Sequence, residues 1–308
     1  MIEHVPHPHL DRARWDAMLR ECSNNLWYAQ SHVLDAASPG WDALVDHERG
    51  AVMPLTHHRK WGIAYLHQPF TIQQLGVFAP DPSPLLTKEF LDHIGRIYRH
   101  ADIFLAEREM KVVPRGWVLT PQQDQLVPMD RTCEGIRATY STNHRRNLRK
   151  VEEAERGFDH DVPLDELIDL LVTSPQFREW GIRPRQEATM RRVMHAARVK
   201  GEATSWGVRT DGRLVAVAYF VHFGGRTIFL KGAALAQARG THAMHFLIDR
   251  MVAMRAGQDL WLDFAGSNDP DLGRFYAGFG AVPQLYLRAT LHRLPGLVRW
   301  VLHKKHGR

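Results

Sequence analysis

The sequence contains few cysteines and no long apolar segment. Its two cysteines, Cys22 and Cys133, lie far apart and outside any CxxC motif, which gives no zinc-ligand spacing and favours a reducing compartment. No apolar run approaches the roughly 20 residues of a membrane-spanning helix. Residues 1–14 lack the apolar block of a secretory signal. These absences predict a cytoplasmic protein, with peripheral binding to the inner membrane face left open.

Several catalytic signatures are also missing. The sequence has no Gly-x-Ser-x-Gly nucleophile elbow, no phosphate-binding P-loop, no low-complexity segment and no short repeat. It has 19 histidines, but His242 and His245, one helical turn apart, have only Asp249 nearby as a third ligand. Because a zinc site needs three or four well-placed protein ligands, we expect no metal.

The excess of positive charge is confined to the C-terminal tail. The formal net charge is +6, and the tail Arg288–Arg308 holds six basic residues and no acidic one, so the remaining charges balance. A balanced body argues against a protein that coats nucleic acid. The tail also contains leucines, valines and a tryptophan, which leaves two interpretations. It makes a weak contact with anionic lipid or RNA, or it is a last helix that packs on its domain.

A length of 308 residues fits about two domains. In the second half, the hydrophobic pattern predicts helices, three antiparallel strands with a hairpin at Gly224-Gly225, then helix, strand, helix and strand. The first half shows a looser version of this order, with a strand from Ile72 to Phe78. A helix is predicted from Thr142 to about Arg156. We therefore predict an α/β (α+β) fold of two tandem domains, residues 1–135 and 136–308, each a mixed, mostly antiparallel sheet flanked by helices.

An apolar strand from Leu260 to Phe264 delivers Asp263 to a Gly266-Ser267 turn. A carboxylate at a strand end lies at the sheet edge where α/β folds bind ligands, and it can hold or deprotonate an amine there. Alternatively, the carboxylate caps the backbone N–H groups of the turn. Tyr276 follows in an aromatic segment, where it can protonate a leaving group or simply fill space in the core.

The passage from Phe229 to Ala243 suits an activated acyl donor. Lys231 can contact a phosphate or acyl carboxylate, or it can be solvated at a strand end. Backbone N–H groups after Lys231 can stabilise an oxyanion, and the start of the next helix can bind a pyrophosphate. The candidate donor-binding residues are Gly232, Ala233, Gln237, Arg239, Gly240, Thr241 and Ala243. An ordinary strand–loop–helix connection is the competing interpretation.

Two further segments are candidates for binding an acceptor. Arg145 and Arg149 share one face of the predicted helix and can bind a polyphosphate or RNA, unless the nearby glutamates balance them. In the first half, Tyr65 precedes Gln73 and Gln74, whose side chains point to opposite faces of a strand. One glutamine then faces inward and needs partners. It lines an acceptor pocket or joins a polar network between the domains.

These motifs together resemble the Fem-like branch of the GNAT acyltransferase superfamily. The segments that carry the resemblance are Tyr140–Lys150, Asp263–Ser267 and Phe275–Gly280, and the similarity spans most of the chain. It implies two tandem GNAT-like domains, a degenerate one over residues 1–135 and an acyltransferase domain over residues 136–308. Members of this branch transfer amino acids from aminoacyl-tRNA or acyl groups from acyl-CoA.

The chain departs from the family pattern at two motifs. Fem ligases usually carry Lys after the Phe of the late motif, where this chain has Tyr276. The donor-binding pattern of the superfamily is matched only by Gln237 and Gly240, because His242 takes the place of a small residue. We predict an N-acyltransferase that uses acyl-CoA as donor and an amine-bearing small molecule, lipid or peptide as acceptor. Transfer from aminoacyl-tRNA and a non-catalytic adaptor protein are the alternatives.

Overall fold

The computed structural model describes residues 1–60, 62–266 and 268–293. The chain forms two compact units: residues 1–122 together with the segment from residue 285 onward, and residues 123–284. This division differs from the expected boundary after residue 135. Residues 123–135 belong to the second unit, and the chain returns to the first at residue 285 because its last strand pairs there.

The first unit begins with a three-stranded antiparallel sheet in the order β1-β2-β3. Its strands are β1 (Ile2–Val5), β2 (Asp42–Asp46) and β3 (Ala51–Leu55). Between β1 and β2 lie η1 (His7–His9), α1 (Arg12–Glu21), η2 (Trp27–Ala29) and α2 (Ser31–Ala37). All five residues of β3 are buried, so this strand reads as a continuous apolar run.

A second sheet of the first unit has the strand order β4-β5-β6-β13-β7. The strands are β4 (His57–Lys60), β5 (Ile63–His67), β6 (His100–Leu105), β7 (Trp117–Pro128) and β13 (Val282–His292). The helix α3 (Pro84–Ile97) starts where the Ser83 hydroxyl accepts the N–H of Leu86. Its apolar face enters the core of this unit through Phe90, Leu91 and Ile94. β13 completes the sheet by pairing antiparallel with β6.

The second unit is built on the strand order β7-β12-β11-β10-β9-β8. Its strands after β7 are β8 (Phe158–Asp159), β9 (Ala203–Thr210), β10 (Arg213–Phe223), β11 (Arg226–Ala234) and β12 (Trp261–Asp263). Its helices are α4 (Cys133–Ala138), α5 (Thr142–Leu148), α6 (Glu152–Arg156), α7 (Leu164–Thr173), α8 (Pro175–Glu179), α9 (Pro184–Val199), η3 (Ala236–Gly240), α10 (Ala243–Arg255) and α11 (Pro270–Ala277). The predicted mixed α/β fold is confirmed.

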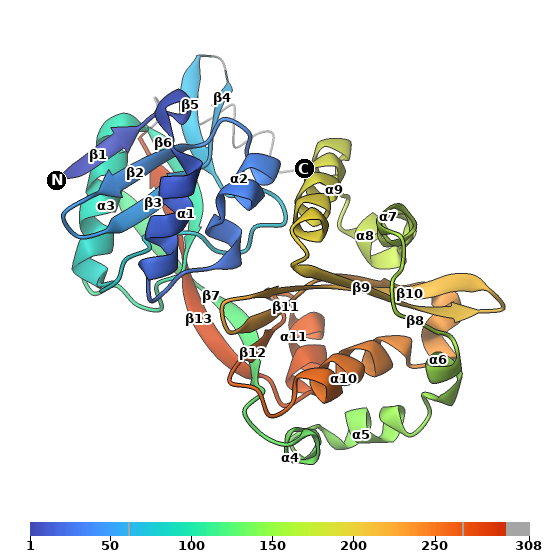
Figure 1. Cartoon of the computed structure of the whole chain (residues 1–308). Helices are drawn as coiled ribbons and strands as arrows, with labels where there is room; N and C mark the ends of the chain where they lie inside the picture. The colour runs from blue at the N-terminus through green and yellow to red at the C-terminus, as the bar shows by residue number, and fades with distance from the viewer. Residues whose placement is uncertain (61, 267, 294–308) are drawn as a thin grey trace. The chain divides into compact units, whose positions relative to one another are not determined.

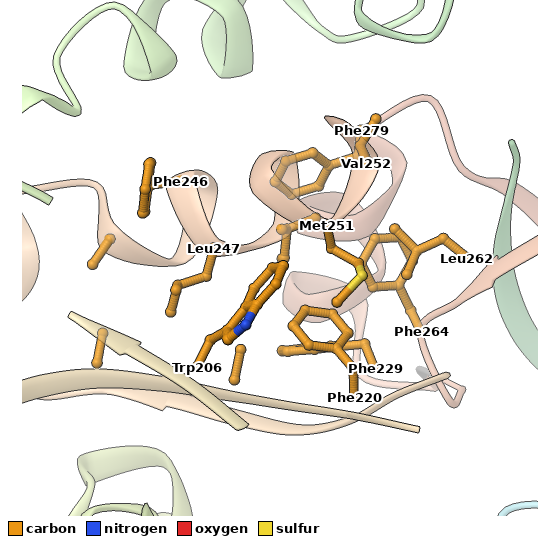
Figure 2. Close-up of a cluster of buried hydrophobic side chains, with 14 of the residues drawn as sticks. Trp206, Phe220, Phe229, Phe246, Leu247, Met251, Val252, Leu262, Phe264 and Phe279 are labelled. Atoms are coloured by element: carbon orange, nitrogen blue, oxygen red, sulfur yellow. The ribbon is translucent and has the colours of Figure 1, made fainter. Parts of the chain in front are cut away.

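The helices of the second unit cover both faces of its sheet. In Figure 1, α7, α8 and α9 lie on one side of β9, β10 and β11, and α10 and α11 lie on the other. The core between the sheet and α10 is aromatic. Figure 2 shows Trp206, Phe220 and Phe229 of the sheet pointing toward Leu247 and Met251 of α10. Burial of such large side chains dominates the stability of the unit.

Two predicted elements were wrong. The segment Ile72–Phe78 is no regular strand and makes only isolated bridges, because Thr71 and Gly76 adopt positive φ angles of 77° and 122°. The predicted helix from Thr142 to Arg156 is two helices, α5 and α6. α5 ends at its C-cap Arg149, and Val151, the N-cap of α6, has a φ of −91° and a ψ of 6°, outside the helical region.

Candidate functional site

The sheet of the second unit opens between β11 and β12. These parallel strands pair only over Arg226–Ile228 and Trp261–Asp263. β12 ends there, whereas β11 continues to Ala234. Among the described strands, residues 229–234 therefore have a neighbour on one side only, which is β10. The other side of β11 faces the opening, where its backbone polar groups can meet a ligand.

A bulge in β11 lies at this opening. Phe229 pairs with Phe220 and Lys231 pairs with Tyr219, so Leu230 is an extra residue without a partner on β10. A bulge rotates the local backbone and re-aims its groups. At Gly232, an added Cβ would lie 2.4 Å from the ring of Phe229, so only glycine fits here. The expected oxyanion-binding residues Gly232 and Ala233 thus follow the bulge.

Asp263 is buried at the end of β12, with 1% of its surface exposed. Its Oδ2 accepts a hydrogen bond from Nη1 of Arg226 at 2.7 Å, and its Oδ1 accepts the N–H of Ala265 at 2.7 Å. Ala265 has a positive φ of 54°, and the N–H of Gly266 reaches Asp124 instead. The carboxylate therefore forms an ion pair and also caps the turn. Capping was one of the two roles expected for it, besides binding an amine. Ser267 lies outside the described residues.

Lys231 lies on the sheet face opposite to α10. It pairs across the strands with Tyr219, whose hydroxyl donates to the carbonyl of Met194 in α9. Directly opposed residues share a face of the sheet. Burial lowers the pKa of Lys231 to about 8. The lysine can therefore exist in part as the free amine near neutral pH.

Tyr276 lies on the α10 face, in the aromatic core. Its ring stacks on Phe264 with a centroid distance of 4.3 Å and an interplanar angle of 12°. Burial, and next the charges of Asp269 and Asp124, raise the pKa of Tyr276 above its usual value. The hydroxyl therefore stays protonated at neutral pH and can donate a proton. The sheet lies between Tyr276 and Lys231, so these two predicted catalytic side chains approach the opening from different faces.

The N-terminus of α10 has no side-chain cap. Its N-cap residue, His242, has a left-handed φ of 52° and makes no capping hydrogen bond. The first N–H groups of a helix lack partners within the helix and attract anions. Burial, followed by the charges of Lys150 and Arg146, lowers the pKa of His242, so both cations lie close to this terminus. An anion at the N-terminus of α10 would therefore be attracted by the charges of Lys150 and Arg146 and by the helix dipole.

The residues predicted to contact the donor surround this terminus unevenly. Gln237 and Gly240 are exposed, and an added Cβ at Gly240 would meet no atom within 4 Å. Thr241 is buried, and its hydroxyl donates to the carbonyl of Ala238 at 2.9 Å. Ala243 is the first residue of α10. The side chain of Arg239 lies outside the described part of the structure.

Arg145 of α5 and Arg149, the C-cap residue of that helix, line a cavity of about 400 Å³. The side chain of Arg145 donates to the carbonyl of Ala138. The cavity also contains Arg137, whose guanidinium pairs with both oxygens of Asp249 at 2.9 and 2.5 Å. Asp263 is not among its lining residues. The structure therefore separates these arginines from the carboxylate at the opening of the sheet.

The predicted acceptor residues of the first unit are half-buried or buried. Tyr65 lies among histidine rings, with centroid distances of 6.1 Å to both His67 and His100. Gln74 is buried. Both amide atoms of Gln73 and the hydroxyl of Thr71 are buried without a hydrogen-bond partner among the described residues. Because Thr71 also has a positive φ, this irregular segment stores strain and unsatisfied polar groups, which are features of binding sites.

A histidine pair that was not predicted from the sequence joins α5, α10 and α11. The rings of His144 and His245 lie 4.6 Å apart and both contact Phe275. Burial lowers the pKa of His245 to about 4 and also lowers that of His144. A Cβ at Gly278 would lie 2.1 Å from the His144 ring. The signal was present in the sequence as a histidine within the basic helix and a glycine after the aromatic segment.

Neither a metal cluster nor a membrane-spanning helix is found in the described ranges. No group of three or more His, Cys, Asp or Glu side chains there is placed to hold a metal ion. No helix within those ranges is both long and apolar enough to cross a bilayer. Residues 294–308, most of the basic tail, lie outside them. Arg288 at the start of the tail forms an ion pair with Asp102.

Comparison with known proteins identifies the class of the second unit. Residues 138–271 match the family model of the acetyltransferase (GNAT) domain, a range that includes β11, α10 and β12. No curated protein sequence matches the chain. The likeness to the GNAT domain thus lies within the second unit.

Solved structures extend the likeness to the whole chain. FemX is 12% identical with a TM-score of 0.64, covering 97% of this chain and 99% of that chain. A tandem GNAT protein from the clavulanic acid biosynthesis pathway is 14% identical with a TM-score of 0.56, covering 96% and 100%. L-PGS from Bacillus licheniformis is 16% identical with a TM-score of 0.54, covering 96% of each chain. These likenesses confirm the predicted fold of tandem GNAT-like domains, which FemX and the tandem GNAT protein share.

Proposed function

We propose that the protein is an N-acyltransferase that moves an acyl group from acyl-CoA to an amine. One observation carries the proposal: β11 parts from β12 over residues 229–234, and the same strand leads into the uncapped helix α10. An opening lined by backbone groups suits a thioester, and a helix terminus with free N–H groups suits a pyrophosphate. Together they accommodate the two ends of a CoA thioester.

The donor would bind along this path. Its phosphates would contact the α10 terminus near Gly240, Thr241 and Ala243, with Gln237 and Arg239 beside them. The charges of Arg146 and Lys150 near His242 favour this anion. The N–H groups of Gly232 and Ala233 would stabilise the carbonyl oxygen as it gains charge. A C–N bond then forms to the amine, the C–S bond breaks, and the thiolate takes up a proton.

Three side chains are proposed to assist these steps. Asp263, held by Arg226, would orient the attacking amine electrostatically, because both of its oxygens are engaged in the turn and the ion pair. Tyr276, whose raised pKa keeps its hydroxyl protonated at neutral pH, would be the proton donor to the leaving thiolate. Lys231 would act on the acceptor side of the sheet, where its pKa of about 8 allows it to take up the proton that the amine loses.

Each unit by itself offers groups that are proposed as candidate contacts for the acceptor. In the first unit, the unsatisfied amide of Gln73, together with Tyr65 and Gln74, would bind polar groups of the acceptor. In the second unit, Arg145 and Arg149 would bind an anionic part of it. An amine-bearing small molecule, lipid or peptide would satisfy these requirements.

Calorimetric titration with acetyl-CoA tests the donor assignment. We expect saturable binding that weakens at least about tenfold in the Arg146→Ala/Lys150→Ala variant, since each lost charge-assisted contact to phosphate is worth about 1.5 kcal/mol. The matched control Arg145→Ala/Arg149→Ala removes two charges that line the separate cavity and should leave this affinity unchanged. Absence of CoA binding, with salt-dependent binding of an aminoacyl-tRNA instead, would reverse the choice of donor. Absence of both would favour a non-catalytic adaptor.

A further inference from the structure

We infer that the outer side of α10 carries a binding groove for a phosphorylated amphiphile, a molecule with a phosphate head and an apolar body. Two cavities of about 400 and 340 Å³ adjoin there and share Arg250 and Ala253 in their walls. Each volume lies in the range of small-molecule sites, which is about 300–1,000 Å³. The two cavities differ in chemistry, and that difference defines the ligand.

The first cavity is cationic. Arg137, Arg145, Arg149 and Arg250 line it. Asp249 neutralises Arg137, and Arg145 donates to a backbone carbonyl. Arg149 and Arg250 are exposed and form no ion pair with any described residue, and the exposed Glu155 is the remaining carboxylate of the lining. Guanidinium groups bind phosphate through paired N–H donors, so a phosphate group is the ligand that this cavity fits best.

A buried hydroxyl lies in the same cavity. Tyr140 lines it while being 2% exposed. Burial, and next the charge of Asp249, raise the pKa of Tyr140, so the hydroxyl remains a neutral donor. Asp249, which pairs with Arg137, therefore also interacts with Tyr140, and the guanidinium groups remain the main determinants of an anionic ligand.

The second cavity is apolar and aromatic. Phe158, Trp206 and Met254 line it, and Met254 is 46% exposed. Phe158 and Trp206 meet edge to face with a centroid distance of 5.3 Å. Arg250 lies between the two chemistries, with its guanidinium 5.6 Å from the centre of the Phe158 ring. An aliphatic or aromatic body in this cavity would cover exposed apolar surface, while its phosphate reaches the first cavity.

The groove is separate from the proposed donor site. Arg146 and Lys150 lie close to His242 at the start of α10, whereas Arg145 and Arg149 line the groove. The two pairs of cations therefore serve two separate surfaces. The binding of the amphiphile stands on the groove alone and does not depend on the proposed function.

Titration with octyl phosphate, at concentrations below its micelle formation, tests the inference. We expect it to bind at least tenfold more tightly than inorganic phosphate, which lacks the body, and than octyl glucoside, which lacks the charge. The Arg149→Ala/Arg250→Ala variant should bind octyl phosphate with at least tenfold lower affinity. The Met254→Asp variant should bind it with at least threefold lower affinity. The control Arg213→Ala, which removes an exposed arginine outside the groove, should change nothing.

Two measurements keep the result interpretable. Thermal unfolding of each variant checks the fold, and acetyl-CoA titration of the same variants should give unchanged affinity, so failure of the groove and failure of the donor site are distinguishable. Equal binding of octyl phosphate and inorganic phosphate would overturn the inference. So would octyl phosphate binding that the groove variants leave intact, or binding to anionic vesicles alone that is insensitive to them.

Discussion

Replacing Asp263 by asparagine separates a structural role of this side chain from a functional one. The substitution removes the ion pair with Arg226 but keeps an oxygen that can accept the N–H of Ala265. Loss of one partner from a buried ion pair costs about 3–5 kcal/mol. Because the Arg226 side chain is 25% exposed and the turn cap survives, we expect a loss of roughly 2 kcal/mol in the free energy of unfolding. Denaturant titration measures this loss.

Activity provides the second measurement for Asp263. If the carboxylate orients the amine, Asp263→Asn should lower kcat at least about 100-fold, at temperatures where the variant is fully folded. The control Arg226→Gln breaks the same ion pair and keeps the carboxylate, so its stability should fall by a similar amount while kcat stays within about fivefold. Equal losses of stability in both variants, with kcat unaffected in Asp263→Asn, would refute the catalytic role and leave a turn cap.

Two further predictions concern packing and pH. Gly278→Ala should destabilise the protein by about 1–3 kcal/mol, because its Cβ would overlap His144. The control Gly95→Ala, inside α3 and only 3.5 Å from the nearest Arg293 atom, should be neutral or stabilising in the same denaturant titration. Lys231→Met should raise Tm at pH 7. The pKa of Lys231 falls from 10.5 to about 8 on folding, so below pH 8 the buried charge destabilises the folded state relative to the unfolded chain. That advantage should shrink as pH rises from about 8 to 10.5; a constant difference in Tm would contradict the lowered pKa.

Much of the fold could be predicted from local patterns. The hairpin at Gly224-Gly225 forms as expected, with φ angles of 51° and 73° that glycine adopts without strain. The strand end at Asp263 also lies where the apolar run stops. These features depend on a few neighbouring residues, and such signals are visible in one sequence. The break between α5 and α6 was not visible, because residues 149–151 contain neither the glycine nor the proline that commonly marks the end of a helix.

The candidate site was predictable in its elements but not in its pairings. The sequence placed Asp263 near a turn but could not show Arg226, 37 residues earlier, as its partner. It placed Arg145 and Arg146 on one basic helix. It could not show that Arg145 lines a groove whereas Arg146 lies close to a helix terminus. Such pairings follow from strand register and helix packing, which a single chain reveals only when folded.

The position of β13 has a consequence for biosynthesis. β6 of the first unit acquires this neighbour only when residues near Leu287 emerge from the ribosome, although β6 itself was made some 180 residues earlier. The stretch 123–284 is fully translated before that moment. The N-terminal unit is thus synthesised first and completed last, and a nascent chain stalled before β13 would expose the edge of β6 to aggregation or to chaperones.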